Sequence, residues 1–244
     1  GSPRDAENLR VLTGLRRDHP HLRILISVGG WTWSKGFSDA ALTAKSRRVF
    51  VASAVDFVRR HDLDGFDVDW EYPGLPGDGN PHRPEDKENF TALMTDLRTA
   101  LDREGARRGR PLLLTFAAGA SREFLAHTEM AKVQAVVDFV NLMTYDFRVA
   151  NPGAPAGHHA NLFPSPNDPR SHSADGAVKD FLAAGVPAAK LVLGVPFYGR
   201  AWEGVGSPER LYREGRPPSQ RMDTSHPSLA ALVGREGWVR VWDF

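Results

Sequence analysis

The chain has 244 residues, 41% of them hydrophobic, and a formal net charge of +1. This composition is ordinary for a globular protein, excludes a disordered or fibrous chain, and offers no basic excess for binding nucleic acid. Without cysteine the chain has no disulfide, thiolate metal site or cysteine nucleophile, and its longest apolar runs fall far short of the roughly 18 residues of a membrane span.

Five apolar segments bounded by turn-forming residues predict buried β-strands. In chain order they are residues 23–28, 65–70, 112–118, 139–145 and 191–197. Amphipathic patterns predict helices over 6–17, 44–60, 84–104 and 178–184. One further candidate strand follows at 238–242. The alternation of apolar strands with helices is typical of a parallel sheet covered by helices.

The spacing of the strands predicts a sheet that is part of a barrel. Four strand–helix units lie between residues 23 and 191, about 42 residues each, so eight such units would need roughly 336 residues. The chain is too short for a closed barrel built at this pace.

The segment DGFDVDWEYP at 64–73 carries the strongest chemical signal. Side chains alternate along a strand, so Asp67, Asp69 and Glu71 share one face while their apolar neighbours share the other. Three carboxylates in a row on a buried strand repel one another and resist desolvation, a cost that stability alone does not justify.

Three interpretations of this row are open. A solvated edge strand leaves unexplained why all three polar residues are acids with no basic residue between them. A Ca²⁺ site needs a loop glycine and an oxygen-rich turn that the segment lacks. A proton-handling array is favoured, because crowding of like charges raises one pKa until the outermost acid, Glu71, is protonated near neutral pH. No metal and no cofactor is therefore expected.

The spacing Asp-x-x-Asp-x-Asp-x-Glu, from Asp64 to Glu71, resembles the signature of the family 18 glycoside hydrolases, the chitinases. Three other segments resemble motifs of this family in the same order along the chain. They are SVGGW at 27–31, MTYDF at 143–147 and PFYGR at 196–200. Four motifs in register make the resemblance specific.

The resemblance implies an α/β fold of the (β/α)8 TIM-barrel type, incomplete here, with about five of the eight parallel strands present. It also implies hydrolysis of β-1,4 bonds between N-acetylglucosamine units of chitin by a retaining, substrate-assisted mechanism. By this analogy Glu71 protonates the glycosidic oxygen and Asp69 holds the acetamido group of the substrate. Asp67 shares a proton with Asp69, and Tyr145 donates its hydroxyl to the acetamido group. Asp64 has the opposite parity, so a structural role at the entry of the strand is expected.

Residues at the predicted strand ends are expected to bind the sugar. They are Trp31, Tyr72, Met143, Asp146, Tyr198 and Arg200. For Trp31 the alternative is core packing, and for Arg200 it is a salt bridge to a neighbouring acid. The pair His158-His159 has no carboxylate beside it in the sequence and is interpreted as exposed loop.

The resemblance begins before the family's third strand and ends before its eighth. We therefore expect a single partial catalytic domain over residues 1–244, with 203–244 as the start of an insertion segment, in a secreted protein whose partner is chitin or chito-oligosaccharides. Two other functions stay open: a chito-oligosaccharide-binding fragment without activity, and an endo-β-N-acetylglucosaminidase of the same fold. The intact Glu71 argues against a sugar-binding relative that has lost its catalytic acid, and it leaves open a fragment that is inert because strands are missing.

The outermost predicted strands, 23–28 and 191–197, lack the charges that normally blunt an exposed sheet edge. An open sheet with such edges is not expected to be a soluble monomer by itself. A second copy of the chain, its own tail around 238–242, or the rest of a longer parent protein would cover the open side.

Overall fold

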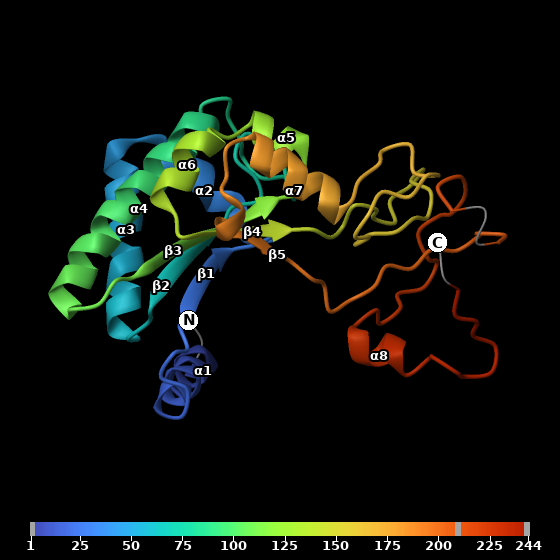
Figure 1. Cartoon of the computed structure of the whole chain (residues 1–244), viewed down its shortest axis with the longest axis horizontal. Helices are drawn as coiled ribbons and strands as arrows, with labels where there is room; N and C mark the ends of the chain where they lie inside the picture. The colour runs from blue at the N-terminus through green and yellow to red at the C-terminus, as the bar shows by residue number, and fades with distance from the viewer. Residues whose placement is uncertain (1–2, 208–210, 242–244) are drawn as a thin grey trace. The chain divides into compact units, whose positions relative to one another are not determined.

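The computed structural model describes residues 3–207 and 211–241 of the chain. It contains a five-stranded sheet in the order β1-β2-β3-β4-β5 (Figure 1). The strands are β1 Leu25–Gly29, β2 Gly65–Asp69, β3 Leu113–Gly119, β4 Phe139–Met143 and β5 Leu191–Leu193. β1 pairs with β2, and β2 with β3, in parallel. All five predicted strands are confirmed, and the sheet is not closed.

Eight α-helices precede, connect or follow the strands in the described part of the chain. They are α1 Pro3–Gly14, α2 Phe37–Leu42, α3 Ala44–Arg60, α4 Asp86–Arg108, α5 Arg122–Ala126, α6 Met130–Val136, α7 Ala174–Ala183 and α8 His226–Ala230. Short 3₁₀ turns lie at Leu15–Arg17, Ser34–Gly36 and Ala188–Lys190. Figure 1 shows α2, α3, α4 and α6 together on one side of the sheet. None of these helices is long and apolar enough to cross a membrane.

The local sequence explains the central helix of this layer. Thr43 and Ser46 form a capping box that begins α3, each side chain bonding the other residue's backbone N–H. The apolar stripe of α3 is buried, and Val58 at its end is inaccessible to solvent. α4 runs four residues beyond its predicted end and stops at Gly109, whose φ of 69° gives the left-handed cap that favours glycine. The helices α2, α5 and α6 were not predicted, because five to seven residues are too few to show a helical period.

Two predicted strands differ from what the structure contains. β5 stops at Leu193, where Gly194 and then Pro196 follow, and a proline has no N–H to give to a sheet. Residues 238–241 are irregular, so the predicted strand there is wrong, while residue 242 lies outside the described residues. Gly234 and Gly237, both with φ of 81°, turn the chain just before this segment.

By its contacts the chain divides into two compact units. The first comprises residues 1–142 and 180–192, which include β1, β2 and β3 and the helices α1 to α6. The second comprises residues 143–179 and 193–244. The single partial domain over 1–244, with an insertion beginning at 203, stays a prediction.

Asp64 forms hydrogen bonds that connect the beginnings of three strands. Its side chain is 1% exposed; Oδ2 accepts the N–H of Ile24 at 2.9 Å, and Oδ1 pairs with Arg110 and Arg16. Its backbone carbonyl accepts the N–H of Leu113 at 2.9 Å. Asp64 therefore joins β1, β2 and β3 where they enter the sheet, which is the structural role predicted for it.

The sheet order leaves β1 and β5 at the edges, and their exposed groups generate a prediction. Val192 of β5 is 44% exposed, and every residue of β1 is at least partly exposed. Because unpaired backbone groups and apolar side chains favour pairing with another chain, we expect the 244-residue chain to self-associate with rising concentration. Light scattering across a dilution series, with a thermal melt, measures this. A monomer at all concentrations with a sharp cooperative melt would contradict it.

Candidate active site

Asp67 lies in the middle of β2, level with polar residues on the strands around it. The strand register aligns it with Ser27 of β1 and Thr115 of β3. Its carboxylate accepts hydrogen bonds from Ser27 Oγ at 2.6 Å, from Thr115 Oγ1, and from Asn141 Nδ2 of β4 at 3.0 Å. The side chain is 9% exposed, and these three donors offset the cost of its burial. Since β2 has a strand on each side, a solvated edge strand is excluded.

Asp69, the last residue of β2, lacks such donors. Its Oδ1 is buried and accepts no hydrogen bond from the described part of the chain. Burial, together with the charges of Glu71 and Asp67, raises the pKa of Asp69 to about 7. Both neighbouring carboxylates act on this group, so the three acids lie together as their alternation predicts. At neutral pH the protonated and ionised forms of the Asp69 carboxyl are therefore both populated.

Glu71 follows two residues after the strand and is 8% exposed. Its backbone N–H donates to Ser34 Oγ at 2.9 Å, and its carbonyl accepts from Asn80 Nδ2 at 2.9 Å. Trp70, between the two acids, is 2% exposed and stacks on Phe37 with ring centroids 5.5 Å apart. Trp70 on one face and the acids on the other are the two faces that the period of two predicts.

Aromatic side chains predicted to bind sugar in the first unit are accessible. Trp31 follows β1 and is 50% exposed, which excludes core packing for it. Tyr72 is partly buried, with its ring edge-on to Phe124 at 6.0 Å between centroids. Both leave apolar ring surface available to a ligand.

The second unit holds a polar cluster around Asp146. Tyr198 Oη donates to this carboxylate at 2.7 Å, Arg200 pairs with it at 2.5 Å, and His159 Nδ1 lies 3.5 Å away. Burial acts to raise the pKa of Asp146, but the contacts with His159, Arg200 and Tyr198 outweigh it and hold the pKa at about 2. Burial and the Asp146 carboxylate raise the pKa of Tyr198 above its usual value. For Arg200 the structure contains the predicted alternative, a salt bridge to a neighbouring acid.

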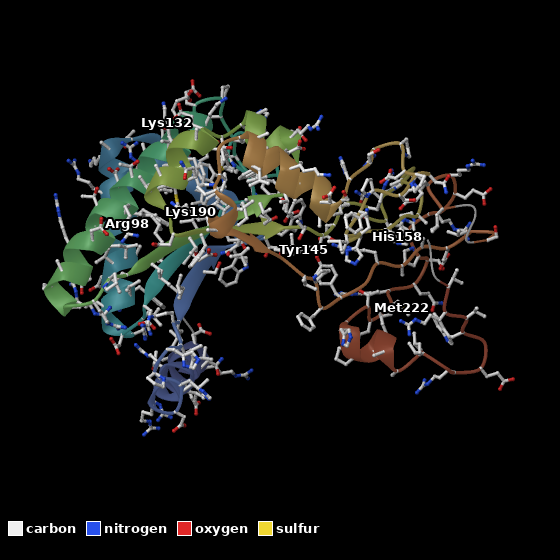
Figure 2. All side chains as sticks on the ribbon, viewed as in Figure 1. Arg98, Lys132, Tyr145, His158, Lys190 and Met222 are labelled. Carbon is white, nitrogen blue, oxygen red and sulfur yellow. The ribbon has the colours of Figure 1, made fainter. Side chains whose placement is uncertain are left out.

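The other predicted residues of this unit lie beside that cluster in the sequence. Tyr145 is labelled in Figure 2 and meets the ring of Tyr198 edge-on, with centroids 6.1 Å apart. Met143, the last residue of β4, is partly exposed. Asp146 has a φ of 58°, a left-handed conformation that aspartate tolerates better than most residues.

The interpretation of the histidine pair as exposed loop is wrong. The His159 side chain is 15% exposed and its ring lies 5.5 Å from that of Tyr198. His158, labelled in Figure 2, is partly buried, with its ring 6.2 Å from Tyr212. Both contacts join residues far apart in the sequence, so no local pattern could predict them. Nowhere in the described chain do three or more His, Cys, Asp or Glu side chains gather as they would around a metal ion.

Strand–helix units, with carboxylates at the carboxyl end of β2, define the class of protein: a barrel-type fold with its polar site at the carboxyl ends of the strands. The sequence profile of the glycosyl hydrolases family 18 matches residues 2–243, and the chain belongs to this family.

Curated relatives are chitinases of greater length. The chain is 50% identical over 207 residues to chitinase A1 of Niallia circulans, a match that covers 82% of this chain and 30% of that protein. It is 40% identical over 210 residues to chitotriosidase-1 of Mus musculus, covering 81% of this chain and 44% of that protein. The chain thus spans less than half the length of these relatives.

Solved structures agree with the fold. A family 18 N-acetylglucosaminidase from Paenibacillus barengoltzii is 44% identical, with a TM-score of 0.88 over 97% of this chain and 69% of that chain. The Ostrinia furnacalis Group IV chitinase in complex with allosamidin is 29% identical, with a TM-score of 0.83 over 96% of this chain and 65% of that chain. The predicted (β/α)8 type, with five strands present, is confirmed.

The raised pKa of Asp69 predicts how stability changes with pH. A carboxyl whose pKa is about 7 when folded, against a usual 3.8, binds its proton more tightly in the folded state. Its ionisation therefore costs nothing below pH 4 and opposes folding increasingly from pH 4 to 7. Asp69→Asn should raise the free energy of unfolding at pH 8 by on the order of 2 kcal/mol and change it little at pH 4.

Denaturant unfolding of both proteins at the two pH values measures this difference. An equal gain at pH 4 and pH 8 would assign the effect to packing, and no gain at pH 8 would contradict the prediction.

Proposed function

We propose that the chain hydrolyses β-1,4 bonds between N-acetylglucosamine units of chitin by a retaining, substrate-assisted mechanism. The observation that carries the proposal is the row of Asp67, Asp69 and Glu71, in which burial and the neighbouring carboxylates raise the pKa of Asp69 to about 7. The chitinases among its relatives support the substrate class. Because chitin is a polymer too large to enter a cell, we propose that the enzyme acts outside it.

Glu71 supplies the proton in this mechanism. It protonates the glycosidic oxygen as the bond to the anomeric carbon breaks, and the acetamido oxygen of the same sugar attacks that carbon. The result is a cyclic oxazolinium-like intermediate and a Glu71 carboxylate. Water then attacks the anomeric carbon while Glu71 takes its proton, so the configuration is retained and the acid is regenerated.

Asp69 and Asp67 act on the acetamido group. The Oδ1 atom of Asp69 has no hydrogen-bond partner in the described protein and can accept the acetamido N–H. Ionised, Asp69 stabilises the positive charge of the intermediate. Asp67 is held by donors on three strands, and in this proposal it shares a proton with Asp69.

The remaining residues bind the substrate in this proposal. Tyr145 donates its hydroxyl to the acetamido group, and Trp31 and Tyr72 offer flat apolar faces to pyranose rings. The polar and sulfur groups expected to line the sugar site are Met143, Asp146, Tyr198 and Arg200. Arg200 orients Asp146 through the ion pair described above.

A second candidate is an N-acetylglucosaminidase of the same fold, because a structure of that description is 44% identical to the chain. The two functions differ in their products: a chitinase releases oligosaccharides from within the polymer, and an N-acetylglucosaminidase releases single sugars. Chromatography of the products from a long chito-oligosaccharide separates them.

Removing the transferable proton tests the role of Glu71. Glu71→Gln should lower the turnover of a soluble chito-oligosaccharide by about 10²–10⁴-fold, since general acid catalysis contributes that much. Affinity for the sugar, measured by calorimetry, and the thermal melt should stay near wild type. Turnover at the wild-type rate in this variant would contradict the assignment. If the unsubstituted chain itself binds the sugar but does not turn it over, the sugar-binding fragment is favoured.

The substrate must carry its own nucleophile. Oligosaccharides of glucosamine or glucose lack the acetamido oxygen, so their cleavage should be slower by orders of magnitude. Proton NMR of fresh product from the acetylated substrate should first detect the β-anomer. If the α-anomer appears first, the substrate-assisted mechanism is wrong; equal turnover of cellulose oligomers would contradict the substrate class.

A further inference from the structure

We propose that Ser34 and Asn80 are positioning residues for Glu71, holding its backbone from both sides beyond the end of the strand. The inference deepens the proposed function and rests on it, since it concerns the acid of that mechanism. Neither residue touches the reacting atoms in this account; each acts through the acid.

Glu71 lies where the sheet no longer fixes the chain. β2 ends at Asp69, whose register partner Gly29 is the last residue of β1. A backbone group outside the ladder must find another partner when it is buried. An acid that donates a proton in a transition state also needs its oxygen held closely, because a displacement of about 1 Å can cost about 10²-fold in rate.

Ser34 replaces the ladder on one side. It is 1% exposed in the 3₁₀ turn Ser34–Gly36, and its hydroxyl oxygen accepts the N–H of Glu71 at 2.9 Å. Ser34 Oγ also lies 2.9 Å from the carbonyl oxygen of Gly30 and 3.0 Å from that of Asp69, and its hydroxyl can donate to either. One buried hydroxyl therefore links the last strand residue to the acid, across Trp70.

Asn80 replaces the ladder on the other side. It is 4% exposed and its Nδ2 donates to the Glu71 carbonyl at 2.9 Å, while its Oδ1 makes no hydrogen bond in the described structure. The backbone at Gly77 also lies against this carbonyl, since a Cβ added at Gly77 would be 2.1 Å from the Glu71 oxygen. In the described structure the side-chain amide of Asn80 makes its hydrogen bond to Glu71, so we assign this amide the role of holding the Glu71 carbonyl.

Leaving-group chemistry separates a positioning role from a purely structural one. A glycoside of phenol needs its oxygen protonated as the bond breaks, whereas a glycoside of 2,4-dinitrophenol leaves readily as the anion. A misplaced acid therefore slows bond cleavage in the first and spares it in the second. The quantity to compare is kcat/KM, because the later attack of water, which also uses Glu71, does not enter it. The ratio of the two rates does not depend on what fraction of a variant is folded.

The experiment compares Asn80→Ala and Ser34→Ala with wild type on the phenyl and 2,4-dinitrophenyl glycosides of N,N′-diacetylchitobiose. We expect kcat/KM on the phenyl glycoside to fall about 10- to 100-fold in each variant. The fall in kcat/KM on the dinitrophenyl glycoside should be less than about 3-fold for Asn80→Ala. If Asn80→Ala does not fold, Asn80→Asp keeps the shape, removes the amide donor, and should give the same selective loss.

Ser38→Ala is the matched control. Ser38 is fully buried and its hydroxyl bonds Asp86 at 2.7 Å, so the variant loses a comparable hydrogen bond that does not end on Asp69 or Glu71. It should lower the melting temperature without changing the ratio of the two rates. An equal loss on both glycosides in Asn80→Ala, or a changed ratio in Ser38→Ala, would overturn the inference.

Failure of the proposed function is recognised separately. If wild type cleaves neither glycoside, the proposed function fails, and amide hydrogen exchange decides the inference alone. The Glu71 N–H should then exchange at least about tenfold faster in Ser34→Ala than in wild type and be unchanged in Ser38→Ala. Equal protection in all three proteins would overturn the role of Ser34 in holding this segment.

Discussion

A carboxylate taken out of water must find donors or keep its proton, and this constraint organises the structure around β2. Asp67 meets it with three donors, one each from β1, β3 and β4. For the buried Oδ1 of Asp69 the described residues supply no donor, and the pKa of this carboxyl is raised to about 7. Alternate residues of one strand thus have different proton chemistry, because the strands beside them supply different partners.

Local pattern predicts the parts of this arrangement that depend on one segment. The five strands, the helix at 44–60 and the common face of the three acids all follow from alternation and periodicity within a few residues. The partners Thr115 and Asn141 follow only from strand register, which brings residues together that are tens of positions apart. Ser34 and Asn80 act from loops whose course no periodicity encodes.

The second unit illustrates the same limit in a different way. Motif spacing directs attention to Asp146 and Arg200, and the structure joins them by an ion pair. His159 joins the same carboxylate from a loop rich in proline and glycine, where local sequence indicates only exposure. From sequence alone, a polar side chain in such a loop is predicted to be exposed to solvent. That prediction fails where a long loop folds back onto the rest of the protein and places the side chain beside an acid, as it does for His159.

Asp64 directly precedes β2, and Glu71 follows two residues after its last residue. Arg110 and Arg16 stabilise the strand's start through Asp64, and the proposed acid lies beyond its end. Substitutions around Asp64 are therefore expected to change heat tolerance and to leave the proposed chemistry as it is. Thermal stability and that chemistry would give laboratory selection two separate targets within one short segment.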